Sequence, residues 1–180
     1  MTVGVDLIWQ KLDAALNSPA PERVLLFADE REAVDALLED VLIARPYLEG
    51  RFSVRHLMYG DVGVLPESLS AQALCVATEG VLWIDHYRGV GESAERARLD
   101  TLRVLEAICL ADALPAFKLV VVLPGIWKGL VPAIVPGFYR QCGVVLELPA
   151  PVLSAAQKRD RDRQSAADMA ASHGSSGFKS

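Results

Sequence analysis

The chain has few of the residues that build metal and phosphate sites. Its 180 residues include three cysteines and three histidines, and no Cys-x-x-Cys pair or Cys/His cluster has the spacing of a zinc site. No lysine occurs between Lys11 and Lys118, so a long stretch of chain lacks the residue type that usually reaches terminal phosphate groups. We therefore expect no metal and no cofactor.

Long apolar runs and an excess of basic charge are also missing. No run of 18 apolar residues occurs, and no basic segment followed by an apolar one opens the chain, so we expect neither a membrane span nor a signal peptide. The formal net charge is −5, which disfavours nucleic acid as a ligand, because phosphate neutralisation supplies most of that affinity. The alternating charges of 158–163 indicate a solvated helix face. The three cysteines have apolar neighbours in the sequence, as reduced thiols of a cytoplasmic protein do.

What the chain does contain is aliphatic. Hydrophobic residues make up 52% and aromatic residues 7% of the chain, so the core must be built from Leu, Val, Ala and Ile. Such a composition favours helices packed on a buried sheet. From residue 151 onward the composition shifts to small and charged residues. We expect one domain over 1–150, followed by a partly helical or disordered tail over 151–180.

Strand and helix patterns alternate along the predicted domain. Aliphatic runs predict strands, and apolar residues at helical spacing predict helices between them. Alternation of this kind is typical of parallel sheets with right-handed crossovers. We predict an α/β fold in three layers, a mainly parallel five-stranded sheet with helices on both faces. The predicted strands are 23–28, 51–57, 81–84, 117–123 and 144–148, and the helices are 5–16, 30–44, 67–78 and 94–111, with a proline-interrupted segment over 127–139.

Parallel sheets bind ligands at the carboxyl ends of their strands. After the first predicted strand come Asp29, Glu30 and Glu32, where a phosphate site would need glycines and a lysine. These carboxylates would repel phosphate. The third predicted strand ends on Asp85 and His86, a hydrophobic strand followed by an acid. Asp85 has two interpretations: a residue of a metal-coordinating type, or a side chain that caps or turns the chain.

Three segments resemble the AAA+ ATPase core of sigma-54 activators and of MoxR or magnesium-chelatase proteins. Residues 77–86 (ATEGVLWIDH) are similar to the family's Ala-x-x-Gly-x-Leu-Phe-Leu-Asp-Glu, its Walker B element. Residues 98–106 (RLDTLRVLE) resemble the helix that follows, and 138–149 (FYRQCGVVLELP) resemble the close of the core. The resemblance implies a P-loop NTPase-like fold over 1–150.

The chain departs from that family at the positions that carry catalysis. The phosphate loop is absent, His86 replaces the second acid of the Asp-Glu pair, and no polar sensor follows the predicted strand at Leu123. The lid domain and the sigma-contacting loop are missing as well. What the resemblance leaves is a scaffold, with Arg140 where the family supplies an arginine to a neighbour's nucleotide. The resemblance implies that the chain is an inactive partner of an active ATPase. The alternative for Arg140 is an ordinary surface role.

Three classes of function stay open. The first is a non-catalytic interaction or regulatory domain that binds a protein partner or its own copies, through Ile126, Trp127 and Val131 or through the tail; the same segment could instead cover the core. The second is an enzyme or small-molecule binder that uses strand-end residues near Asp85 and His86. A hydrolase would need Ser70 or Cys75 beside His56 or His86, and neither Ser70 nor Cys75 lies in a known nucleophile motif. The third is a nucleic-acid-associated protein acting through arginine-rich patches.

Overall fold

The computed structural model describes residues 3–44, 52–55, 80–86, 91–111 and 118–149. The chain divides into two units, Met1–Ala150 and Pro151–Ser180, and the described residues all belong to the first. The predicted helix over 67–78 and the predicted tail lie outside the described residues.

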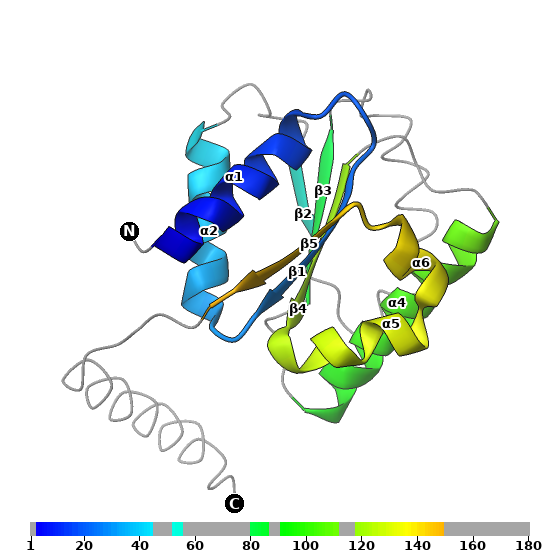
Figure 1. Ribbon diagram of the computed structural model, residues 1–180. Coiled ribbons are helices and arrows are strands. Elements are labelled where there is room, and N and C mark those ends of the chain that lie inside the picture. Colours follow the sequence, from blue (N-terminus) through cyan, green and yellow to red (C-terminus); the bar gives the residue numbers. More distant parts are fainter. Residues whose placement is uncertain (1–2, 45–51, 56–79, 87–90, 112–117, 150–180) are drawn as a thin grey trace, which may run out of the picture. The chain divides into compact units, whose positions relative to one another are not determined.

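The described part of the first unit is an α/β structure built on a parallel sheet, as the sequence predicts. Figure 1 shows its elements in chain order, coloured from blue to yellow. The strands pair in the order β2-β3-β4-β1-β5, and every pair is parallel. The strands are β1 (Arg23–Ala28), β2 (Phe52–Arg55), β3 (Val81–Asp85), β4 (Lys118–Pro124) and β5 (Val144–Leu148). The helices are α1 (Val3–Asn17), α2 (Arg31–Ala44), α4 (Glu92–Leu110), the 3-10 helix η3 (Gly125–Gly129), α5 (Val131–Ile134) and α6 (Pro136–Gln141).

Two hydrophobic clusters pack against the strands. Alternate side chains of β1 point to opposite faces, so Leu25 and Phe27 join one cluster while Val24 and Leu26 join the other. The first cluster includes α4, α5 and α6, and the second includes α1 and α2. Figure 1 shows these helices on opposite sides of the strands. Each fully buried Leu or Phe contributes about 1.5–3 kcal/mol.

The proline-interrupted segment forms three short helices. Pro132 and Pro136 lie in the first turns of α5 and α6, where a missing N–H has no helical partner to lose. Val131, Val135 and Phe138 are fully buried from these turns. The segment therefore covers the α4 side of the sheet, which is one of the two alternatives for residues 127–139.

Candidate functional site at the carboxyl end of the sheet

The chain leaves β1 and β4 toward opposite faces of the sheet. β1 leads into α2, which packs in one cluster, whereas β4 leads into η3, which packs in the other. β1 and β4 are neighbours in register, with Ala28 beside Pro124. Open α/β sheets bind ligands at such a topological switch point, outside the carboxyl ends of the strands. A ligand site of this kind would lie here.

A carboxylate of the chain itself occupies this point. A Cβ atom built on Gly125 would lie 2.1 Å from Oδ1 of Asp29 and 3.7 Å from the carbonyl oxygen of Ala28. The Asp29 side chain therefore lies directly over the first residue of η3. Glu32 adds a negative charge in the first turn of α2, where a helix N-terminus would otherwise attract an anion. The local electrostatics oppose a phosphate group.

At the end of β3, both residues of the Walker B-like pair are buried. Asp85 is 3% and His86 4% exposed. Burial, followed by the charge of Arg98, lowers the pKa of His86 from 6.5 to about 4, so the imidazole is neutral at pH 7. Its Nε2 atom has no hydrogen-bond partner within the described ranges. His86 is thus held away from solvent, where a general base would need contact with a substrate.

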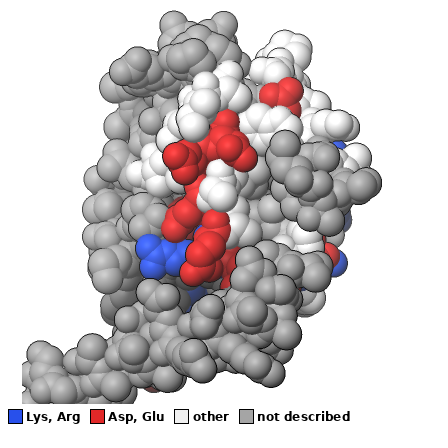
Figure 2. All heavy atoms as spheres, turned by 90° about the vertical axis from the view of Figure 1, so that its left-hand side faces the viewer, with Lys and Arg blue, Asp and Glu red and all other residues white. Residues whose placement is uncertain are grey.

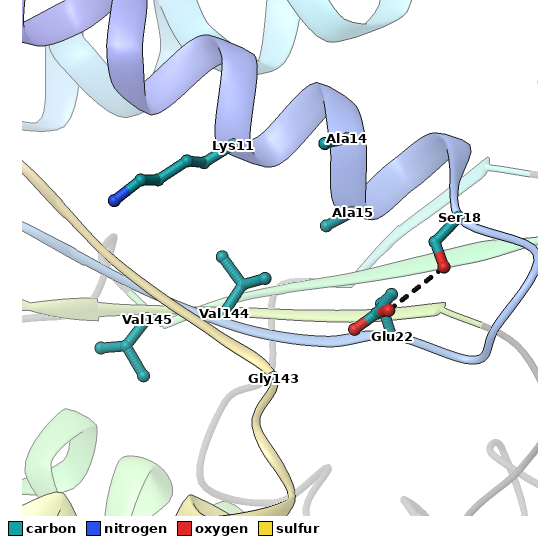
Figure 3. A pocket seen from close by; sticks show the side chains of 8 residues that line it. All are labelled: Lys11, Ala14, Ala15, Ser18, Glu22, Gly143, Val144 and Val145. Atoms are coloured by element: carbon teal, nitrogen blue, oxygen red, sulfur yellow. Dashed lines mark hydrogen bonds between the residues drawn. The ribbon is translucent and has the colours of Figure 1, made fainter.

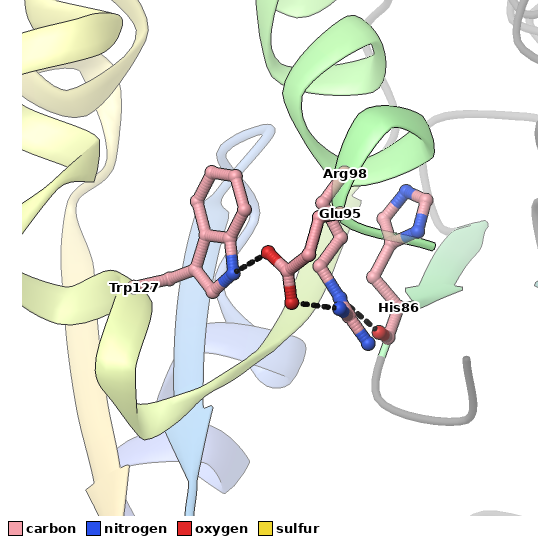
Figure 4. A network of polar contacts seen from close by, with 4 residues as sticks. All are labelled: His86, Glu95, Arg98 and Trp127. Carbon is pink, nitrogen blue, oxygen red and sulfur yellow. Dashed lines mark hydrogen bonds and ion pairs between the residues drawn. The ribbon is translucent and has the colours of Figure 1, made fainter. Parts of the chain in front are cut away.

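A polar network fixes the chain beside this pair (Figure 4). Nε of Arg98 donates to the carbonyl oxygen of His86 at 2.8 Å, and Nη1 forms an ion pair with Glu95 at 2.6 Å. The other Glu95 oxygen accepts the indole N–H of Trp127 at 3.0 Å. The network links β3, α4 and η3, so its geometry serves to hold three elements together. Because the Glu95 carboxylate is half exposed, solvent weakens the ion pair.

The predicted partner surface has to be corrected. Trp127 is 5% exposed and Val131 is fully buried, and both belong to the core cluster on the α4 side. Ile126 is 79% and Leu130 is 47% exposed. The prediction placed Ile126, Trp127 and Val131 on one surface. In helical turns, residues three or four positions apart share a face, so Trp127 and Val131 point inward together. Ile126 and Leu130 are therefore the exposed apolar residues of this segment.

Arg140 lies on the exposed side of α6, where its Nε donates to the carbonyl oxygen of Pro136 at 3.2 Å. Glu106 of α4 holds the start of that helix, because its carboxylate accepts the backbone N–H groups of Gly137 and Phe138 at 2.9 and 2.5 Å. The guanidinium group is thus accessible, and its helix is anchored to α4.

Sequence reasoning missed Arg98. The buried residues of α4 include Arg98, Thr101 and Leu102. A signal was present: Arg98 lies on the same helical stripe as Leu102, Leu105 and Cys109, with Glu95 one turn before it. The other residues proposed for a hydrolase, the histidine His56 and the nucleophiles Ser70 and Cys75, lie outside the described residues.

Metal and thiol chemistry gain no support from the described residues. Within these ranges, no group of three His, Cys, Asp or Glu side chains could hold a metal ion. Burial raises the pKa of the Cys142 thiol to about 12, with the charge of Arg23 opposing the shift, and Cys109 is buried. The Cys142 thiol therefore stays protonated, and both cysteines pack as small side chains in an apolar setting.

None of the described helices is both long and apolar enough to cross a lipid bilayer. No protein-family model, curated protein or solved structure matches this chain. The AAA+ resemblance therefore stays a prediction.

Proposed function

We propose that this chain is a non-catalytic protein-interaction or regulatory domain on a degenerate AAA+-like scaffold. In this proposal the complete domain has five parallel strands in three layers, of the P-loop NTPase-like type, and binds an active ATPase or its own copies. The observation that carries the proposal is the Asp29 carboxylate over Gly125. A nucleotide's phosphates would have to displace that charge.

The contact surface proposed for a partner lies beside this point. Ile126 and Leu130 are exposed at the start of the segment that follows β4, and Lys128 between them forms an ion pair with Glu147 of β5. An exposed apolar pair rimmed by charged side chains is typical of protein contacts. The alternative, an enzyme that uses Asp85 and His86, has less support because both side chains are buried.

Calorimetry with magnesium and ATP or ADP tests the proposal. We expect no heat of binding at high protein concentration, because Asp29 and Glu32 repel phosphate and no lysine is nearby in the sequence. An Asp29→Asn variant removes the negative charge but keeps the size of the side chain. It therefore shows whether the charge or the bulk of Asp29 opposes phosphate binding. Micromolar binding of nucleotide by the unmodified chain would contradict the proposal and make a catalytic function the better-supported one.

The exposed position of Arg140 also supports a role in trans. If Arg140 contacts a nucleotide bound to a partner ATPase, Arg140→Ala lowers that partner's ATPase rate about tenfold or more, since a missing transition-state arginine costs at least that much. Arg103→Ala, at another exposed arginine, on α4, is the matched control and should leave the rate unchanged. Equal rates for the two variants would remove Arg140 from the proposal.

A further inference from the structure

β5 is an edge strand among the described strands, where it pairs only with β1. The other row of its backbone N–H and C=O groups has no partner strand in the described part of the chain. Natural edges are often protected by proline or by charged side chains. The sequence of β5 is Val-Val-Leu-Glu-Leu, and its one charged residue, Glu147, forms an ion pair with Lys128. Val145 on the same strand is 39% exposed, and a β-branched edge with one charge favours addition of another strand.

A groove runs between this strand and α1. It encloses a cavity of about 560 Å³. Figure 3 shows Lys11 at one end of the groove and the Ser18–Glu22 hydrogen bond at the other. Small and apolar side chains line the groove between these ends, so an adjacent backbone could approach closely. They are Ala14, Ala15 and Val144, whereas the side chain of Val145 points to the other face of the strand (Figure 3).

The two charges of the groove are available to another molecule. Within the described part of the chain, neither Lys11 nor Glu22 forms an ion pair. Glu22 marks the amino end of β5, because a Cβ atom on Gly143 would lie 2.8 Å from its Oε2. Lys11 lies about two helical turns of α1 before Ser18, and therefore toward the carboxyl end of the strand (Figure 3). The groove is positive at one end of the strand and negative at the other.

We infer that the occupant of this edge is a second copy of the chain, related by a two-fold axis. Antiparallel pairing of two β5 strands places the amino end of one against the carboxyl end of the other. Lys11 of each copy then faces Glu22 of the other copy. One isologous contact therefore forms two Lys11–Glu22 ion pairs, and the two sheets join into one. The inference uses a surface separate from Ile126 and does not depend on the AAA+ resemblance.

Sedimentation velocity over a wide range of concentrations tests the dimer. Val145→Glu adds a second negative charge to the strand that holds Glu147. In an antiparallel pair of β5 strands centred on Leu146 it faces Glu147 of the other copy, so it should weaken dimerisation about tenfold or more. Ile126→Glu puts the same charge on an exposed apolar position away from the edge and should leave the dimer intact. A protein that stays monomeric at every concentration overturns the inference. So does a dimer that Val145→Glu does not weaken.

Charge reversal tests the orientation of the two copies. Lys11→Glu or Glu22→Lys alone should weaken the dimer roughly 2- to 30-fold, because an exposed ion pair changes an association constant by about 1.4- to 5-fold and symmetry counts it twice. The double variant should recover most of the loss, because each reversed charge again faces its opposite. If the double variant dimerises no more tightly than the weaker of the two single variants, the antiparallel arrangement is overturned. Thermal unfolding of each variant shows whether the monomer still folds, and calorimetry with ATP reports separately on the proposed function.

Discussion

At the scale of single residues, Arg98 and His86 are the unusual members of the core. Arg98 is 2% exposed, and a buried guanidinium needs partners for its donors. It finds them in the His86 carbonyl oxygen and the Glu95 carboxylate. Burial is the main reason that the pKa of His86 is lowered, and the positive charge of Arg98 lowers it further. Arg98 thus ties α4 to the end of β3 and adds to the effect of burial on its neighbour.

This arrangement predicts a loss of stability in mild acid. His86 has a pKa of about 4 when folded and 6.5 as its ordinary value, so between these values the unfolded chain binds the extra proton. The contribution of the neutral imidazole is fully present above pH 6.5 and is lost as the pH falls toward 4. The full loss is about 3 kcal/mol. Urea unfolding at a series of pH values measures it.

The matched control is His86→Gln, which keeps a polar side chain without a titrating ring. Its free energy of unfolding should fall less steeply between pH 6.5 and 4, while acid sensitivity from carboxylates at lower pH remains. Equal slopes for the two proteins would show that His86 is exposed to solvent in the folded state.

At the scale of elements, the junction of α4 and α6 depends on one carboxylate. Glu106 supplies the acceptors for two N–H groups at the start of α6, a role that a capping side chain of the helix itself usually plays. No residue next to Pro136 could do so through its own side chain. Gly137 keeps the space open, because a Cβ atom there would lie 2.8 Å from Oε1 of Glu106.

The two residues should therefore couple. Glu106→Ala should lower the free energy of unfolding by about 0.5–2 kcal/mol, the usual cost of a lost cap. Gly137→Ala should destabilise the unmodified chain, since the new methyl group displaces the carboxylate. In the Glu106→Ala background it should instead stabilise by up to about 1 kcal/mol, because alanine favours a helix and the steric conflict is gone. Urea unfolding of the four proteins checks this, and additive effects would contradict the proposed contact.

Elements with a strong local pattern were predictable from sequence. β1 and β5 have the predicted bounds, and α4 begins two residues before the predicted start, where Gly91 has a φ of 84° that favours glycine. The inward residues of the segment after β4 were not predictable, because its burial depends on packing against α4. Asp29 over Gly125 also joins positions far apart in the chain, which no local pattern reveals.

At the scale of the whole molecule, charge is unevenly distributed. Figure 2 shows acidic side chains gathered in a stripe on the face that includes α2, whose Glu32, Glu39 and Asp40 are exposed. This face opposes nucleic acid, in agreement with the net charge of −5. The sequence indicated the sign of the net charge, whereas the gathering of acidic side chains on one face is a property of the fold.

The strand order also has a consequence for synthesis. β1 pairs with β4 and β5, and Leu25 lies beside Val121 and Val145, which follow it by 96 and 120 positions. A ribosome adding about 5–20 residues per second takes roughly 5 to 25 seconds to supply those partners. Until β4 is made, the apolar strand β1 has neither neighbour, and until β5 is made it lacks one of the two. The vulnerable stage in the life of this protein is therefore the time before its last strand emerges.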